Sequence, residues 1–309
     1  MRHFLDLKDI SREDLKKIIL DSEKRKQKRD PFKKSKLDDD LPLDGKTLIM
    51  MFEKPSTRTR VSFDLAAKQL GGNTLMINPD DMHLGQGEES IHDTAKVLTQ
   101  YADIVMLRTT SHKKAIEFSK HLGIPLINGL TNLSHPTQVL SDVFTIYENK
   151  GKIESLKIAW VGDGNNMLNS FIEASVKFNF ELNIGCPKKF LPNKKVLDYA
   201  KKNKAKINIF YSPNQAVKNV DCVMTDKYVS VLSDKTSKNK NKKKFFKKFQ
   251  VNRKLMSLAK KDAIFLHCLP ASRGTEVTNE VIDSKQSLVW EQALNRLYVQ
   301  KAIICFCLK

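Results

Sequence analysis

The chain has 309 residues, of which 40% are hydrophobic and 29% are charged, and it carries a formal net charge of +19. This length allows two domains that each bury a core of their own. No apolar run approaches the length of a membrane span, and charges in the first ten residues argue against a signal peptide, so we expect a globular, cytoplasmic protein.

Strand-like and helix-like segments alternate along the chain. Short apolar runs predict strands at 47–52, 74–77, 104–107 and 124–127 in the first half. In the second half they predict strands at 157–161, 181–185, 207–210, 222–225 and 263–267. The alternation predicts an α/β fold of two doubly wound domains with parallel sheets. We place the first domain at residues 1–149 and the second at 150–289.

The most informative segment, Ser56-Thr57-Arg58-Thr59-Arg60, follows the predicted strand 47–52 and opens a helix. The first N–H groups of a helix lack partners within it, and the dipole is positive there, so this end favours an anion. Ser56 and Thr57 add hydroxyl donors, and Arg58 adds a guanidinium suited to phosphate oxygens. A capped helix with a solvated basic face is the alternative. Two arginines close to the cap favour the phosphate site.

Polar motifs follow further predicted strands. Arg108-Thr109 stands at the end of the strand 104–107, and His135-Pro136-Thr137-Gln138 opens a helix. His267-Cys268-Leu269-Pro270 stands at the end of the strand 263–267. Ligands of open α/β sheets bind at the carboxyl ends of the strands, where these motifs lie. We therefore expect the motifs to contribute to one ligand site.

Gly162-Asp163-Gly164 follows the predicted strand 157–161 and invites a dinucleotide-binding interpretation. Met167 stands where the third glycine of that fingerprint should be, so the match is weak. A strand-to-helix junction whose Asn166 faces a ligand fits the residues better.

Taken in this order, the motifs resemble the aspartate/ornithine carbamoyltransferase family over nearly the whole chain. The Ser-Thr-Arg-Thr-Arg turn and His-Pro-Thr-Gln are shared by both branches of the family and indicate carbamoyl phosphate. The ornithine branch carries Cys-Leu-Pro where the aspartate branch typically has Pro-Leu-Pro, so His267-Cys268-Leu269-Pro270 resembles the ornithine branch. Glu53-Lys54 and the run 165–170 also resemble that branch.

The resemblance implies transfer of the carbamoyl group from carbamoyl phosphate to the side-chain amine of L-ornithine, giving citrulline and phosphate. Such a step belongs to arginine biosynthesis or the urea cycle. It implies no cofactor and no metal, because carbamoyl phosphate carries its own leaving group. It further implies a homotrimer with active sites near subunit interfaces, a site in the cleft between the two domains, and a last helix, 290–309, that packs back on the first domain.

The resemblance also assigns site residues. Carbamoyl phosphate would be bound by Ser56, Thr57, Arg58, Thr59, Arg108, His135, Gln138, Cys268, Leu269 and Arg296. Ornithine would be bound by Asn166 at its α-carboxylate, by Asp226 at its α-amino group, and by Ser230, Val231 and Cys268. Arg108, His135 and Cys268 form the implied catalytic set, in which His135 donates to the carbonyl oxygen.

Two segments depart from the family pattern. After Asp226 the family usually runs Thr-Trp-Val-Ser-Met-Gly, whereas here Leu232 replaces the glycine and limits the backbone. The family also places a glutamine, often from a neighbouring subunit, where His83 stands, so either His83 or Gln86 would take that role.

Other functions remain open at this stage. The same chemistry on putrescine, N-acetylornithine or aspartate is one alternative, with aspartate disfavoured because Cys268 and Asp226 suit an amine. A polyanion-binding protein on a transferase fold is another, resting on eight lysines and no acid in residues 235–248. A solvated loop explains this run better, since no nucleic-acid motif accompanies it. Five cysteines without ligand spacing predict neither a disulfide framework nor a zinc site.

Overall fold

The computed structural model describes residues 1–78, 89–228 and 244–309. Contacts divide the chain into two compact units. Unit 1 comprises Met1–Leu140 together with Arg296–Lys309, and unit 2 comprises Ser141–Asn295. Each unit contains one parallel sheet with helices between its strands, which confirms the predicted α/β fold with two parallel sheets.

Unit 1 is built on a four-stranded sheet in the order β2-β1-β3-β4. Its strands are β1 (Thr47–Phe52), β2 (Asn73–Ile77), β3 (Ile104–Arg108) and β4 (Leu126–Leu130). Its helices are η1 (Leu7–Asp9), α1 (Arg12–Gln27), α2 (Thr57–Gln69), α3 (Ile91–Tyr101) and α4 (His112–His121), with parts of α5 (Pro136–Lys150) and α12 (Val289–Leu308).

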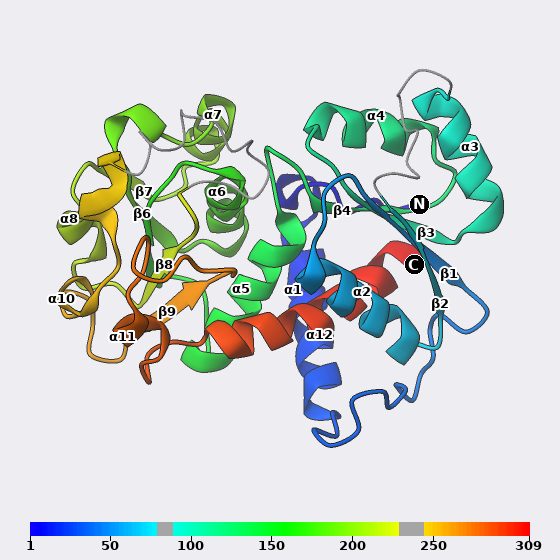
Figure 1. Cartoon of the computed structure of the whole chain (residues 1–309), viewed down its shortest axis with the longest axis horizontal. Coiled ribbons are helices and arrows are strands. Elements are labelled where there is room, and N and C mark those ends of the chain that lie inside the picture. The colour runs from blue at the N-terminus through cyan, green and yellow to red at the C-terminus, as the bar shows by residue number, and fades with distance from the viewer. Residues whose placement is uncertain (79–88, 229–243) are drawn as a thin grey trace. The chain divides into compact units, whose positions relative to one another are not determined.

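The sheet of unit 1 is covered by helices on both faces. Ile49 and Met51 of β1 pack with Leu98 of α3 and Phe118 of α4 in one hydrophobic cluster. Figure 1 shows α3 and α4 side by side on this face and α2 on the opposite face. Burial on both faces explains why β1 is a continuous apolar run rather than an alternating one.

The position of β4 differs from the prediction, which placed this strand at 124–127. The strand begins two residues later, at Leu126, and continues through Gly129 to Leu130. A Cβ at Gly129 would lie 2.3 Å from the Met106 sulfur, so any other residue here would require the Met106 side chain to move. The register also shifts between Leu107 and Arg108, opposite this glycine. Glycine usually weakens a strand, which is why the pattern misplaced its end.

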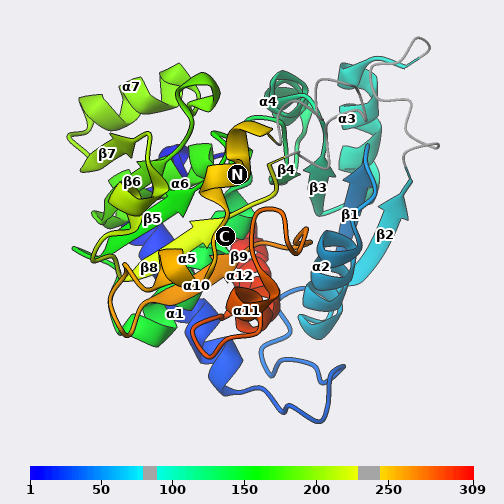
Figure 2. The same cartoon turned by 60° about the vertical axis from the view of Figure 1, so that its left-hand side comes forward.

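Unit 2 is built on a five-stranded sheet in the order β7-β6-β5-β8-β9, whose strands lie side by side in Figure 2. They are β5 (Lys157–Val161), β6 (Glu181–Gly185), β7 (Ile207–Phe210), β8 (Cys222–Thr225) and β9 (Ile264–His267). The helices are α6 (Asn166–Phe178), η3 (Lys188–Phe190), α7 (Lys194–Lys202), α8 (Pro213–Val217), η4 (Lys247–Phe249), α10 (Arg253–Met256) and α11 (Asn279–Ile282), with parts of α5 and α12.

The parallel direction of the strands places the predicted motifs. All strand pairs in both sheets are parallel, so within each sheet the carboxyl ends of the strands share one edge. Arg108 is the last residue of β3, Asp226 follows β8, and Cys268 follows β9. Sites at such edges are the usual ligand sites of open α/β sheets. Of the helices in the described ranges, none has the length and apolarity needed to cross a bilayer.

Candidate active site

The N-terminus of α2 carries the first group of candidate residues, which lies in unit 1. Ser56 caps the helix, with its Oγ accepting a hydrogen bond from the Thr59 N–H at 3.4 Å. Thr57 is the exposed first residue of the helix, and Arg58 is half-buried beside it. The cap confirms that the motif opens a helix at the end of a buried strand, where an anion is favoured.

The Thr59 hydroxyl joins several predicted residues into one buried network. Its oxygen accepts from Arg296 Nη2 at 2.9 Å and from Arg108 Nη1 at 3.5 Å. Arg296 Nη1 also donates to the Gln138 carboxamide. Both arginines are at most 5% exposed. The hydroxyl and the carboxamide in these contacts carry no charge of their own, whereas each guanidinium is positively charged.

His135 lies against the same positive charges. Burial, followed by the charges of Arg296, Arg108 and Arg58, lowers its pKa well below the usual value of 6.5. Its imidazole is therefore neutral at pH 7. A neutral imidazole carries one N–H donor, so it can polarise a carbonyl without adding a positive charge.

Glu53 fixes the turn that follows β3, a role that the sequence did not reveal. Its carboxylate accepts from Thr109 Oγ1 at 2.5 Å, from the Thr110 N–H at 2.9 Å and from Lys114 Nζ at 2.7 Å. Its own N–H donates to the Arg108 carbonyl at 2.9 Å. Burial alone would raise the pKa of Glu53, but the bonds from Lys114, Thr109 and the Thr110 N–H, together with the charge of Lys114, lower it.

Sequence separation hid this contact. The partners of Glu53 stand 56 to 61 positions later in the chain. Pairing of β1 with β3 brings Phe52 opposite Arg108 and so places Glu53 beside the turn. In the sequence, Glu53-Lys54 stands out only as part of the motif that resembles the ornithine branch.

In unit 2 the turn after β5 carries a second group of candidate residues. A Cβ at Gly164 would lie 2.3 to 2.5 Å from the backbone of residues 190–192, so only glycine fits there. Asn165 caps α6, with Oδ1 accepting from the N–H groups of Met167 at 3.0 Å and Leu168 at 3.1 Å. Asn166 is the first residue of α6 and is only 8% exposed. The segment is therefore a strand-to-helix junction, as predicted, and the expectation that Asn166 faces a ligand stays a prediction.

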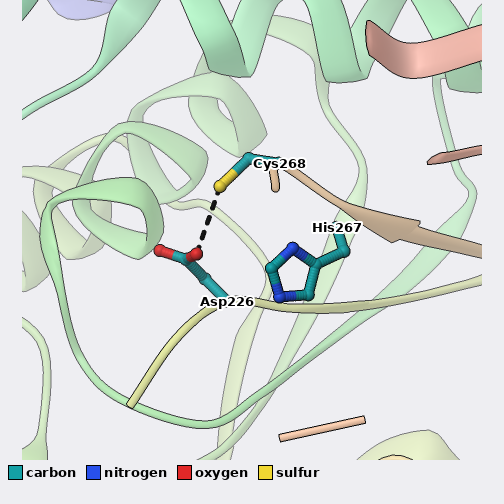
Figure 3. Close-up of side chains that lie close together, drawn as sticks. All are labelled: Asp226, His267 and Cys268. Carbon is teal, nitrogen blue, oxygen red and sulfur yellow. Dashed lines mark hydrogen bonds between the residues drawn. The ribbon is translucent and has the colours of Figure 1, made fainter. Parts of the chain in front are cut away.

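Asp226 connects this helix start with the loop after β9. Asn165 Nδ2 donates to its Oδ2 at 2.8 Å, and the Cys268 thiol donates to its Oδ1 at 3.1 Å. Figure 3 shows the thiol pointing at the carboxylate, with the ring of His267 alongside. The ring holds the loop itself, because its Nδ1 accepts from the Leu269 N–H at 2.9 Å. Leu269 has a φ of 56°, in the left-handed region that a β-carbon disfavours.

Asp226, His267 and Cys268 offer three atoms of metal-ligating type within 4.8 Å of one another. Spacing along the sequence gave no sign of this cluster, because Asp226 comes from a different strand end. In the described geometry the thiol is directed at the carboxylate and the ring nitrogen at the loop backbone. The roles of Asp226 and Cys268 in binding substrate, and the absence of a metal, stay predictions.

Several predicted residues lie outside the described part of the chain. They are His83, Gln86, Ser230 and Val231. The lysine-rich run 235–248, on which the polyanion alternative rests, is described only from residue 244 onward. Just before this gap, Tyr228 is buried and stacks on Phe246 with ring centroids 4.5 Å apart. An aromatic residue thus occupies the position of the family's tryptophan.

The units divide the predicted site residues between them. Unit 1 holds Ser56, Thr57, Arg58, Thr59, Arg108, His135, Gln138 and Arg296. Unit 2 holds Asn166, Asp226, Cys268 and Leu269. The resemblance implies that Cys268 and Leu269 bind carbamoyl phosphate. They belong to unit 2, whereas the other described residues implied for carbamoyl phosphate belong to unit 1.

Two family models match the chain. The carbamoyl-P binding domain of aspartate/ornithine carbamoyltransferase matches residues 2–148, and the Asp/Orn binding domain matches residues 154–307. A curated ornithine carbamoyltransferase from Rhodopseudomonas palustris is 48% identical over 307 residues, which cover 99% of this chain and 96% of the relative. One from Mesorhizobium japonicum is 46% identical and covers 100% of this chain and 99% of the relative.

Solved structures agree with this assignment. The structure of ornithine carbamoyltransferase from Pyrococcus furiosus aligns with this chain with a TM-score of 0.92 and 40% sequence identity. The alignment covers 99% of this chain and 97% of the Pyrococcus chain. The anabolic ornithine carbamoyltransferase from Campylobacter jejuni has a TM-score of 0.90 and 40% identity, covering 99% of both chains.

Proposed function

The chain belongs to the aspartate/ornithine carbamoyltransferase family, and on this premise we propose that it transfers the carbamoyl group of carbamoyl phosphate to the side-chain amine of L-ornithine. The products are citrulline and phosphate. The observation that carries the proposal is the buried network of Thr59, Arg108, Arg296 and Gln138 at the start of α2. It supplies positive charge and fixed donors in unit 1, and the carbamoyl-P binding domain model matches residues 2–148 of the chain.

Unit 1 residues hold carbamoyl phosphate in this proposal. The start of α2, from Ser56 to Thr59, takes the phosphate, and Arg108 reaches both the phosphate and the carbonyl oxygen. Phosphate leaves with its negative charge neutralised by guanidinium groups that are already in position, so little reorganisation is needed during the reaction. Glu53 supports this by holding both sides of the Arg108 turn.

His135 polarises the carbonyl in this proposal, and Gln138 orients the carbamoyl group. The arginines and burial keep the imidazole neutral, so it acts as an N–H donor rather than as an acid. A neutral donor strengthens its bond to the oxygen as negative charge develops there, without competing for the phosphate.

Unit 2 residues hold ornithine. Asn166 at the start of α6 receives the α-carboxylate, where the helix dipole also favours negative charge. Asp226 receives the α-amino group, and Cys268 lies beside the path of the side chain. The reacting amine must be unprotonated, since an ammonium has no lone pair, so turnover rises with pH until that amine is neutral.

The biological setting extends the proposal. We place the step in arginine biosynthesis, in keeping with the anabolic enzyme among the structural relatives. We further propose a cytoplasmic homotrimer, in which a residue of the 79–88 segment from a neighbouring subunit completes the carbamoyl phosphate site. His83 and Gln86 are the two candidates, and substitution of each to alanine separates them.

The test is citrulline formation from carbamoyl phosphate and L-ornithine, with putrescine, N-acetylornithine and aspartate measured in parallel. We expect ornithine to be the preferred substrate, and Arg58→Ala to lower kcat/KM for carbamoyl phosphate by roughly a hundredfold or more, because a charge-assisted contact is lost. Arg253→Ala, at an exposed arginine that begins α10, is the matched control and should retain activity.

Turnover of another amine in place of ornithine would support carbamoyl transfer as the reaction but would reject ornithine as the substrate. No turnover of any amine, or an Arg58→Ala variant as active as the parent, would reject the proposed role of α2. Binding to nucleic acid that vanishes on deletion of residues 235–248 and falls steeply with salt would instead support the polyanion alternative.

A further inference from the structure

The side chain of Asn165 makes hydrogen bonds in two directions at once. Its carbonyl oxygen, Oδ1, accepts from the Met167 and Leu168 N–H groups at 3.0 and 3.1 Å. Its amide nitrogen, Nδ2, donates to Asp226 Oδ2 at 2.8 Å. One planar group therefore connects the first turn of α6 with the carboxylate that follows β8.

The chemistry of the partners fixes the orientation of this amide. Backbone N–H groups can only donate, so they require the oxygen, and an ionised carboxylate can only accept, so it requires the nitrogen. Rotating the amide by 180° would place Oδ1 against the Asp226 carboxylate, so that two acceptors would meet. It would also place Nδ2 against the N–H groups of Met167 and Leu168, so that donors would meet. The side chain thus has a single satisfied arrangement, and it holds Asp226 at a fixed distance from the helix start.

The other support of Asp226 is weaker. Its Oδ1 accepts from the Cys268 thiol at 3.1 Å, and a thiol is a weak donor. The amide of Asn165 donates to a charged acceptor, which makes a stronger bond. Of these two contacts, the one from Asn165 therefore does more to fix the orientation of the Asp226 carboxylate.

We propose that Asn165 is a positioning residue that selects substrates with an α-amino and an α-carboxylate group on the same carbon. Asn166 receives the carboxylate and Asp226 receives the amine, and Asn165 sets the separation of these two receptors. The inference rests on the proposed function, because it uses those roles. It adds that the choice of an α-amino acid depends on a residue that does not itself bind the substrate.

The test compares two probes that lack the reacting amine. L-norvaline carries both α-groups on a three-carbon side chain, whereas pentanoate carries only the carboxylate. Their inhibition constants against carbamoyl transfer are measured for the full-length protein and for Asn165→Ser. Serine can accept from the helix N–H groups and keep the cap, but it has no amide to donate to Asp226.

We expect the preference for L-norvaline over pentanoate to fall roughly 10- to 100-fold in Asn165→Ser, the range for a lost hydrogen bond to a charged group. The KM for carbamoyl phosphate should not change. Asn193→Ser is the matched control, because Asn193 caps α7 in the same way, accepting from the Lys195 N–H at 2.9 Å. This control should leave the preference intact.

A second variant protects the test against misfolding. Asn165→Asp keeps a strong helix cap but places a second carboxylate beside Asp226, so it should lower the preference for L-norvaline at least as far. An unchanged preference in either folded variant, or an equal loss for both probes, would overturn the inference alone. Failure of the parent protein to form citrulline would overturn the proposed function, and the inference with it.

Discussion

At the scale of single residues, His135 shows how surroundings set chemistry. An isolated histidine titrates near pH 6.5 and would be partly charged in many cells. Burial and three arginines instead keep its imidazole neutral. In the proposed function, the same arginines that attract the phosphate also help to keep this imidazole a neutral donor.

This arrangement predicts a loss of stability in mild acid. Below pH 6.5 His135 binds a proton in the unfolded chain, whereas in the folded protein it stays neutral until the pH reaches its lowered pKa. The free energy of unfolding therefore falls as the pH drops toward that lowered pKa. One such group contributes a slope of up to about 1.4 kcal/mol per pH unit. We expect His135→Gln to reduce the slope between pH 6.5 and 5, measured by urea unfolding at several pH values.

His121→Gln serves as the control for that experiment, since it removes another histidine, one that is half-buried at the end of α4. In the His121→Gln variant, the slope of the free energy of unfolding against pH should match that of the parent protein. Identical slopes for the parent and His135→Gln would mean that His135 is not held neutral.

At the scale of elements, α12 depends on a buried ion pair with the segment that precedes β1. Lys301 is 2% exposed and donates to Asp38 Oδ1 at 2.5 Å. Arg25 of α1 donates to the other oxygen of Asp38 at 2.6 Å. One carboxylate thus binds cations from two helices that lie far apart in the sequence.

Asp38→Asn should therefore destabilise unit 1 by about 2–4 kcal/mol, because it leaves the buried Lys301 ammonium without this counter-charge. Lys301→Met should cost less, about 1 kcal/mol, since Asp38 keeps Arg25 and methionine fills a similar volume. Chemical denaturation measures both. Equal losses in the two variants would show that the lysine charge does not depend on Asp38.

Lys17→Met is a matched surface control for these variants. Lys17 contacts Asp14 at 3.5 Å and its side chain is 75% exposed, so the pair contributes little. Its unfolding midpoint should stay within error of the parent.

At the scale of the whole molecule, unit 1 is assembled from both ends of the chain. Arg296–Lys309 belongs to it and buries Leu297, Val299, Ile303, Ile304 and Phe306. At about 2 kcal/mol for each buried side chain, these residues contribute roughly 10 kcal/mol. That is comparable to the whole stability of an ordinary domain, about 5–15 kcal/mol.

A chain that ends at Asn295 should therefore have an unfolded unit 1, while unit 2 keeps all of its own residues. Limited proteolysis should degrade residues 1–140 rapidly and leave a resistant fragment that begins near residue 141. Removal of the exposed Lys309 alone is the control and should leave both units resistant. Full resistance of unit 1 in the shortened chain would contradict this account.

Much of this architecture is legible in the sequence because its causes are local. Runs of apolar residues between turn formers predicted β1, β5, β6, β7 and β8 with their exact bounds. Ser56 and Asn165 stand just before helices, where their side chains cap the free backbone groups. Motif order along the chain likewise indicated the family.

Other features required the tertiary structure because their causes are distant in sequence. Near its end, β4 carries Gly129 against the sulfur of Met106, and its register with β3 shifts there. The contacts of Glu53 with Thr109 and Lys114 follow from the pairing of β1 with β3, and those of Arg296 with Thr59 follow from the return of the chain to unit 1. The sequence by itself determined the elements and the chemical groups of the site, since propensity and capping act within a few residues. Only the tertiary structure decided which groups meet, how buried they are and therefore which protonation state His135 adopts, since burial and charge act through space.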